Sequence, residues 1–223
     1  QLVVGAPVAA DVPQLFVTAL TLGPGLTPVR AAIESSIDRG DLARFFVPAP
    51  SAALPGLQPG ASDLMPVARP TAVTPPRELT LRFDETADHE RGIAQRLQVK
   101  LQPFGYRVAL KPLPHHDVKA TPPGANELVL RSFALPPTAT GALLQWLEIA
   151  GQTARAPAVL QQLAAAPDAE ARAKELSQSL AAELPVIPLV TRGLGVTAVR
   201  DLQHLTRDAM GLPRVDDAFF AAE

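Results

Sequence analysis

Hydrophobic and polar positions alternate most regularly between Leu79 and Pro112. Leu79, Leu81 and Phe83 fall on one side of an extended segment whose other side is polar, which is the period of two of a half-buried strand. After an acidic turn, apolar residues recur at spacings of four, four and three, which places them on one face of a helix. These residues are Ile93, Leu97, Leu101 and Phe104.

A second strand follows this helix. Gly105 stands where a helix end favours a positive φ, and Tyr106, Val108 and Leu110 then form the apolar side of a strand. A strand, a helix and a strand with short connections predict a βαβ unit whose two strands are parallel. We therefore expect an α/β fold with a mixed sheet flanked by helices.

Further elements are predicted on both sides of this unit. Apolar runs predict strands at residues 15–20, 127–133, 186–190 and 194–199, the last two joined by a turn at Arg192-Gly193. Helices are predicted at residues 139–150, from Pro157 and from the N-cap Asp168.

Two short helices are predicted within residues 27–46. Thr27 and Pro28 have the pattern of an N-cap followed by proline in the first turn, and Arg39-Gly40 closes this helix. Either Asp38 or Asp41 can cap the second helix. The apolar residues of the pair are Val29, Ile33 and Ile37, then Leu42, Phe45 and Phe46.

Two proline-rich segments show no regular period. Residues 47–76 predict an irregular surface loop, with a disordered linker between two domains as the alternative. Residues 112–124 predict a polar loop that contains His115, His116 and Asp117. Neighbouring residues of one loop rarely converge on an ion without a further ligand, so we predict no metal site and no cofactor.

Composition narrows the functional classes. The hydrophobic fraction of 47% supports a real core, and a net charge of −2 argues against a general nucleic-acid binder. The absence of cysteine excludes disulfides and thiolate chemistry. The N-terminal residues lack the basic segment and cleavage site of a signal peptide. We therefore expect either that such a segment was removed or that the chain belongs to a longer polypeptide.

Enzymatic motifs are absent from the sequence. It contains no G-x-S-x-G elbow, no phosphate-binding loop, no H-E-x-x-H motif and no dinucleotide fingerprint, and its carboxylates are scattered. We predict that the protein is not an enzyme.

Three segments, in order, resemble the C-terminal lobe of the family 5 (peptide/nickel-type) extracellular solute-binding proteins of ABC transporters. The first is VRAAIESSIDRGDL, the second is ERGIAQRLQVKLQPFGY, and the third is ARAKELSQSLAAELPVIPL. The resemblance implies a periplasmic-binding-protein-like fold of type II. It also implies a missing first lobe, because members of that family hold their solute in a cleft between two lobes.

The resemblance implies a division of the chain into three parts. Residues 1–20 would form a hinge segment, residues 21–199 the C-terminal lobe with the proline-rich surface loop at 47–76, and residues 200–223 a return toward the first lobe.

The ligand-binding residues are also inferred from the resemblance. Peptide binders of the family carry a tryptophan and then an acidic loop after the third strand, where an aspartate pairs with the α-amino group of the ligand. Here Phe133 stands in place of the tryptophan and no acid follows. The candidate cleft residues are Phe133, Ser132, Arg131 and Arg192. Core packing is the alternative role for Phe133, and a solvated charge is the alternative for each arginine.

The implied function is solute binding for import. The chain would be the second lobe of a periplasmic or lipid-anchored protein that captures a small polar or peptide-like solute and delivers it to an ABC permease in the membrane. The alternative is that such a lobe has been reused as a sensor, a regulatory domain or a protein-interaction module.

Overall fold

The computed structural model describes residues 15–47, 51–58 and 78–193, together with four two-residue strands closer to the C-terminus. Its main sheet has the order β2-β6-β1-β5-β3-β4. These strands are β1 (Leu15–Leu22), β2 (Ser51–Ala53), β3 (Glu78–Asp84), β4 (Arg107–Leu113), β5 (Glu127–Leu135) and β6 (Val186–Gly193). Strand β3 is parallel to β4 and β5, whereas β1 is antiparallel to β5 and β6. The mixed sheet expected from the sequence is confirmed.

Two small antiparallel pairs lie outside this sheet. They are β7 (Leu202–Gln203) with β10 (Phe219–Phe220), and β8 (Thr206–Arg207) with β9 (Pro213–Arg214).

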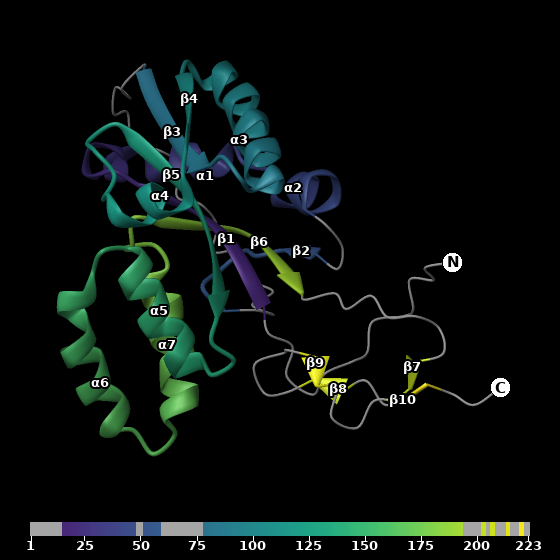
Figure 1. The fold of residues 1–223 in the computed structure, drawn as a ribbon. Helices are drawn as coiled ribbons and strands as arrows, with labels where there is room; N and C mark the ends of the chain where they lie inside the picture. The colour runs from purple at the N-terminus through teal and green to yellow at the C-terminus, as the bar shows by residue number, and fades with distance from the viewer. Residues whose placement is uncertain are drawn as a thin grey trace.

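Helices cover both faces of the main sheet (Figure 1). On one face lie α1 (Arg30–Ser35), α2 (Arg39–Phe46) and α3 (Asp88–Leu101), and on the other lie α5 (Ala139–Ile149), α6 (Ala156–Ala164) and α7 (Ala169–Leu180). The central strand β1 contributes to both cores, because Leu20 and Leu22 enter the first and Val17 and Ala19 enter the second. Both faces of its sequence are therefore apolar, as expected for a strand between two helical layers.

The βαβ unit forms as predicted, with one exception. Ile93, Leu97 and Leu101 are buried on α3, and Gly105 ends the helical segment with φ +86°. Phe104, expected on the same buried face, is instead 48% exposed. The last turn tightens into a 3-10 helix, η2 (Gln102–Phe104), whose three residues per turn rotate Phe104 away from the stripe.

The helix boundaries in residues 27–46 differ from the prediction. Thr27 caps no helix, because it lies inside a 3-10 helix, η1 (Pro24–Val29), from which α1 continues. Arg39 and Gly40 do not close α1 but form the first turn of α2. Asp38 is the N-cap of α2, and its carboxylate accepts a 2.9 Å hydrogen bond from the Asp41 amide.

The two segments predicted as loops contain regular structure. Strand β2 lies within residues 47–76 and pairs with β6, and Leu54 and Leu57 behind it are buried in the core under α5. The indole of Trp146 donates a 2.6 Å hydrogen bond to the Leu57 carbonyl, so residues 51–58 pack on the domain and do not form a linker. A short helix, α4 (His115–Ala120), occupies the second segment and buries Val118.

The turn predicted at Arg192-Gly193 is also wrong, because both residues belong to β6. The strand predicted at 194–199 lies outside the described residues, as does the N-terminal part of the predicted hinge segment; its residues from Leu15 onward belong to β1. Within the described part of the chain, none of the helices has the length and hydrophobicity needed to span a membrane.

A glycine substitution tests the backbone geometry of the βαβ unit. Gly105→Ala should destabilise the chain by about 1 to 2 kcal/mol, because an L-residue at φ +86° is strained even though a Cβ would meet no atom there. The free energy of unfolding from urea titrations measures this loss. Gly40→Ala in the first turn of α2 is the matched control and should cost nothing; equal losses at both positions would contradict the assignment.

Candidate functional site

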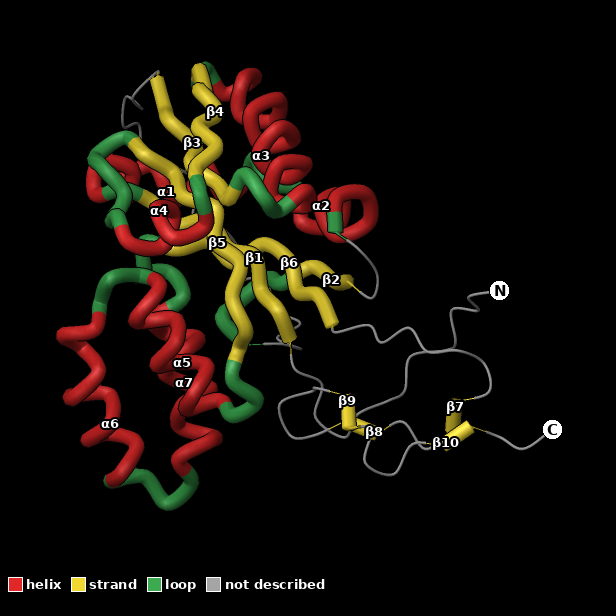
Figure 2. Tube along the Cα trace, in the orientation of Figure 1, coloured by secondary structure: helices red, strands yellow, loops and turns green. Residues whose placement is uncertain are grey.

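The strands bring their carboxyl ends to one edge of the main sheet. Strands β3, β4, β5 and β6 run in the same direction, and β1 runs opposite to them, so its first residue Leu15 pairs with Leu135 at the end of β5 and with Gly193 at the end of β6. Figure 2 shows these three strand ends side by side. In open α/β sheets, ligands bind outside the carboxyl ends of the strands, so this edge is the first place to seek a site.

A chain of hydroxyl and imidazole groups lies at this edge on the face covered by α3. The hydroxyls of Thr18 and Ser132 are 3.0 Å apart, and Nε2 of His89 is 3.1 Å from the Ser132 hydroxyl. Thr18 and Ser132 are directly opposite each other in the β1–β5 register, and His89 stands in the first turn of α3. Thr18 is only 4% exposed, whereas Ser132 and His89 are half-buried.

A buried carboxyl group, that of Glu90, lies next to the hydroxyl of Ser132. Glu90 is 3% exposed, and its Oε2 accepts a 2.9 Å hydrogen bond from the backbone amide of Asp84. Burial raises the pKa of Glu90, and it outweighs the hydrogen bonds from Ser132 and the Asp84 amide, which act in the opposite direction. The local environment therefore favours the protonated form of Glu90 more than water does.

Asp84 at the end of β3 is the opposite case. Its burial would raise its pKa, but hydrogen bonds from Thr86 and His115 outweigh this and hold the pKa below its ordinary value. Nδ1 of His115 lies 2.6 Å from Oδ2 of Asp84, and the Thr86 hydroxyl donates a 2.6 Å hydrogen bond to Oδ1. His115 thus binds a carboxylate, and no cluster of three potential metal ligands exists among the described residues.

Arg192 supplies the positive charge at this edge. Its guanidinium lies over the ring of Phe16 at 5.6 Å from the centroid, and Phe16 and Arg192 are paired across β1 and β6. Burial lowers the pKa of His89, and the charge of Arg192 lowers it further. His89 is therefore a neutral imidazole near neutral pH, able to donate from one nitrogen and accept at the other.

The four binding residues predicted from the sequence are not brought together. Ser132 and Arg192 lie on the α3 side of the sheet, with Thr18 and Phe16. Arg131 and Phe133 flank Ser132 in β5, so they point to the opposite face. Phe133 packs edge-to-face on Trp146 at 5.1 Å, and Arg131 lines a separate pocket.

Sequence reasoning missed Thr18, Phe16 and His89 at this edge. The sequence carried a signal for Thr18, which is a polar residue inside an apolar strand. It also carried a signal for His89, which comes shortly after the strand end at Asp84. Their convergence depends on the antiparallel pairing of β1 with β5, which separates partners by more than one hundred residues and has no local signature.

The arrangement supports binding more than catalysis. A histidine that activates a serine needs a third group to orient its other nitrogen. In the described part of the chain no hydrogen bond reaches Nδ1 of His89, and the Ser132 hydroxyl is shared with Thr18. Among the described residues, the edge offers the neutral groups of Thr18, Ser132 and His89 beside the Arg192 guanidinium, with the Asp84 carboxylate engaged by Thr86 and His115.

Neither the protein-family models nor the curated proteins give a match to this chain. Solved structures do. The murein tripeptide-binding protein MppA of Escherichia coli matches with a TM-score of 0.70 at 16% identity over 95% of this chain and 49% of its own. NikA of Brucella suis in complex with Fe(III)-EDTA matches with a TM-score of 0.71 at 16% identity, over 94% and 52%.

A third similar structure is the ABC transporter substrate-binding protein CtaP of Listeria monocytogenes. Its TM-score is 0.69 at 12% identity, over 94% of this chain and 51% of its own. The chain therefore shares the fold of part of these binding proteins, and it spans about half the length of the structures it matches. The periplasmic-binding-protein-like fold expected from the sequence is confirmed.

The electrostatics of the edge can be tested through His89. Arg192→Met should raise the pKa of His89 toward its ordinary value, because the variant removes a nearby positive charge. Titration of the imidazole resonances by NMR measures this change. Arg155→Met, which removes a surface arginine paired with Glu183, is the control and should leave the His89 titration unchanged. An identical His89 pKa in all three proteins would show that Arg192 does not act on it.

Proposed function

We propose that this chain is one lobe of the solute-binding component of a peptide-type ABC importer, and that the solute binds against the carboxyl edge of its sheet. The observation that carries the proposal is the half-buried polar edge, Thr18–Ser132–His89 with Arg192, on a lobe that has the fold of half a solute-binding protein. The edge lies where β1 begins and β6 ends, the positions at which such a lobe would join another.

The proposed contacts are those that reach the edge from the α3 side. Arg192 would bind a carboxylate or a carbonyl of the solute through its planar guanidinium, held in place by the ring of Phe16. Ser132 and His89 would supply neutral hydrogen bonds. Phe133 would act indirectly, because its contact with Trp146 fixes the strand beside Ser132.

The solute class follows from these groups. The Arg192 guanidinium beside these hydroxyls favours a small polar or peptide-like solute with a carboxylate or carbonyl group. No acidic residue follows Phe133 before the N-cap Thr138, so this wall has no carboxylate there to pair with an α-amino group. The solute would therefore be oriented by its acceptor end.

A single lobe, which forms only one wall of the proposed cleft, would bind the solute weakly. A cleft protein gains affinity by closing both lobes on the ligand and excluding water. We infer that a second lobe completes the site, that an ABC permease in the membrane receives the solute, and that the protein works in the periplasm or elsewhere in the cell envelope.

The native polypeptide tests the two-lobe proposal. An immunoblot of fractionated source cells should show a band at about twice the 23.5 kDa of this chain, outside the cytoplasm. A 23.5 kDa band, or a cytoplasmic band, would contradict the transport role and favour a lobe reused for another purpose.

Arg192 can be tested in that native polypeptide. Arg192→Met should weaken the binding of trialanine, measured by calorimetry, by about tenfold, because a charge-assisted bond to the peptide carboxylate is lost. Arg107→Met, an exposed arginine on β4, is the matched control and should bind trialanine as the parent protein does. Micromolar binding of trialanine by the 223-residue chain alone would contradict the need for a second wall.

A further inference from the structure

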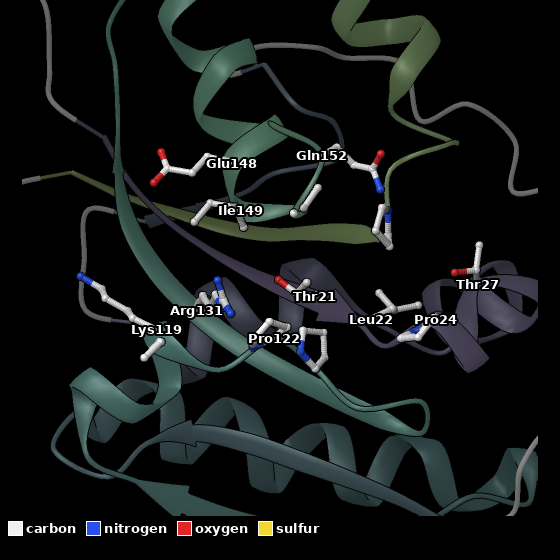
Figure 3. A pocket seen from close by; sticks show the side chains of 15 residues that line it. Thr21, Leu22, Pro24, Thr27, Lys119, Pro122, Arg131, Glu148, Ile149 and Gln152 are labelled. Atoms are coloured by element: carbon white, nitrogen blue, oxygen red, sulfur yellow. The ribbon is translucent and has the colours of Figure 1, made fainter. Parts of the chain in front are cut away.

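A separate pocket of about 550 Å³ lies on the other face of the sheet (Figure 3). Thr21 of β1 and Arg131 of β5 form its floor. Lys119 at the end of α4 lies beside Arg131, and Glu148 and Ile149 at the end of α5 form the opposite wall. The proposed solute edge uses Ser132 and Arg192 on the α3 side, so the two sites share no residue.

Arg131 is an uncompensated cation in this pocket. Among the described residues it makes no ion pair, and its Nε is buried without a hydrogen-bond partner. Its neighbour Arg82 is also positive, and Arg82 uses its own Nη2 on the carbonyls of Thr121 and Pro122, both at 3.0 Å. Burial and the charge of Arg82 lower the pKa of Arg131. A half-buried guanidinium without an anion calls for an acidic partner.

Thr21 forms the buried part of the floor beside Arg131. The residue is 2% exposed, and its hydroxyl has no hydrogen-bond partner in the described part of the molecule. Buried hydroxyls are almost always paired, with protein or with a bound molecule. Thr21 and Arg131 stand on the same face of adjacent strands, and the partly exposed Arg131 is the floor group that a small ligand can contact.

The opposite wall of the pocket is negative. Glu148 lies in the last turn of α5, where the carbonyl end of the helix adds to its charge. Its carboxylate accepts a hydrogen bond from Gln145 but pairs with no cation among the described residues. The pocket therefore has a positive floor, a negative wall and an apolar surface between them at Ile149 and Pro185.

We propose that this pocket binds a small zwitterion of the amino-acid type. The carboxylate of the ligand contacts Arg131, its ammonium group faces Glu148, and its aliphatic part lies on Ile149 and Pro185. The class follows from the charges: Arg131, with Lys119 beside it, requires an anionic group and repels a simple cation, and an ammonium group near the exposed Glu148 adds a partly solvated ion pair.

Three isosteric probes test the proposal on the full 223-residue chain: L-leucine, 4-methylpentanoate, which lacks the ammonium group, and 3-methylbutylamine, which lacks the carboxylate. NMR titration should show L-leucine shifting the amide resonances of Thr21, Arg131 and Gln152 with a millimolar Kd. We expect 3-methylbutylamine to bind at least about tenfold more weakly, and 4-methylpentanoate about threefold more weakly because its missing ammonium group would face the exposed Glu148. No shift at roughly 50 mM L-leucine would overturn the proposal, given the affinities such small ligands reach, and so would equal binding of 4-methylpentanoate.

Two variants test which pocket residue contacts each charged group of the ligand. Arg131→Met should weaken L-leucine binding by at least about tenfold, whereas Arg107→Met on β4 should leave it unchanged. Glu148 is exposed, so Glu148→Gln should fold normally even if Arg131→Met on β5 does not. It should weaken L-leucine about threefold and leave 4-methylpentanoate unaffected, in line with a partly solvated ion pair. Unchanged L-leucine binding in Glu148→Gln would overturn the zwitterion assignment.

Discussion

The alternation of side chains along the central strands governs both the packing and the chemistry of this molecule. Strand β1 lies between β5 and β6 with helices on both faces, so Leu20 and Leu22 fill one core while Val17 and Ala19 fill the other. A shift of one residue in the strand pairing would turn each group of β1 side chains to the opposite face, where they would not fit the helices that pack there. The same register separates Ser132 from its neighbours Arg131 and Phe133. Two chemically different surfaces therefore arise from three consecutive residues of β5.

Two half-buried arginines tie helices to β6 and so help to hold the chain in this register. Arg30 donates from Nη2 to the carbonyls of Ala181 at 2.7 Å and Val186 at 3.0 Å, and Arg39 donates to the Pro188 carbonyl at 2.8 Å. Both arginines also pair with Glu34. The helices α1 and α2 are thereby tied to the start of β6, a bulged strand in which Pro188 cannot donate to the ladder. A planar guanidinium serves such paired acceptors better than an ammonium group does. The position of Arg192 at the far end of β6 depends on this anchoring.

Sequence patterns predicted the parts of the fold whose signal is local and repeated. The strand at residues 79–83, the helix with Ile93, Leu97 and Leu101, and the strand at 127–133 all show a period over several residues. Strand β2 and helix α4 were missed because three and six residues are too few to show one. Phe104 was misplaced because a 3-10 turn changes the phase without changing the composition. At the candidate site, the sequence predicted Ser132 and Arg192 but not Thr18 or His89, because strand pairing over long separations decides which side chains meet.

The carboxyl edge combines two groups that burial drives toward neutrality with the charged side chains of Asp84 and Arg192. Burial raises the pKa of Glu90 and lowers that of His89, so each favours its uncharged form more than it would in water. Neutral donors and acceptors lose less hydration than ions when a ligand displaces water, so they can contact a solute at lower cost. Arg192 remains positive and half-exposed beside Phe16, where it can orient an approaching carboxylate before the solute is buried. If the proposed function holds, such an edge would select a solute by hydrogen-bond geometry first and by its charge at Arg192 second.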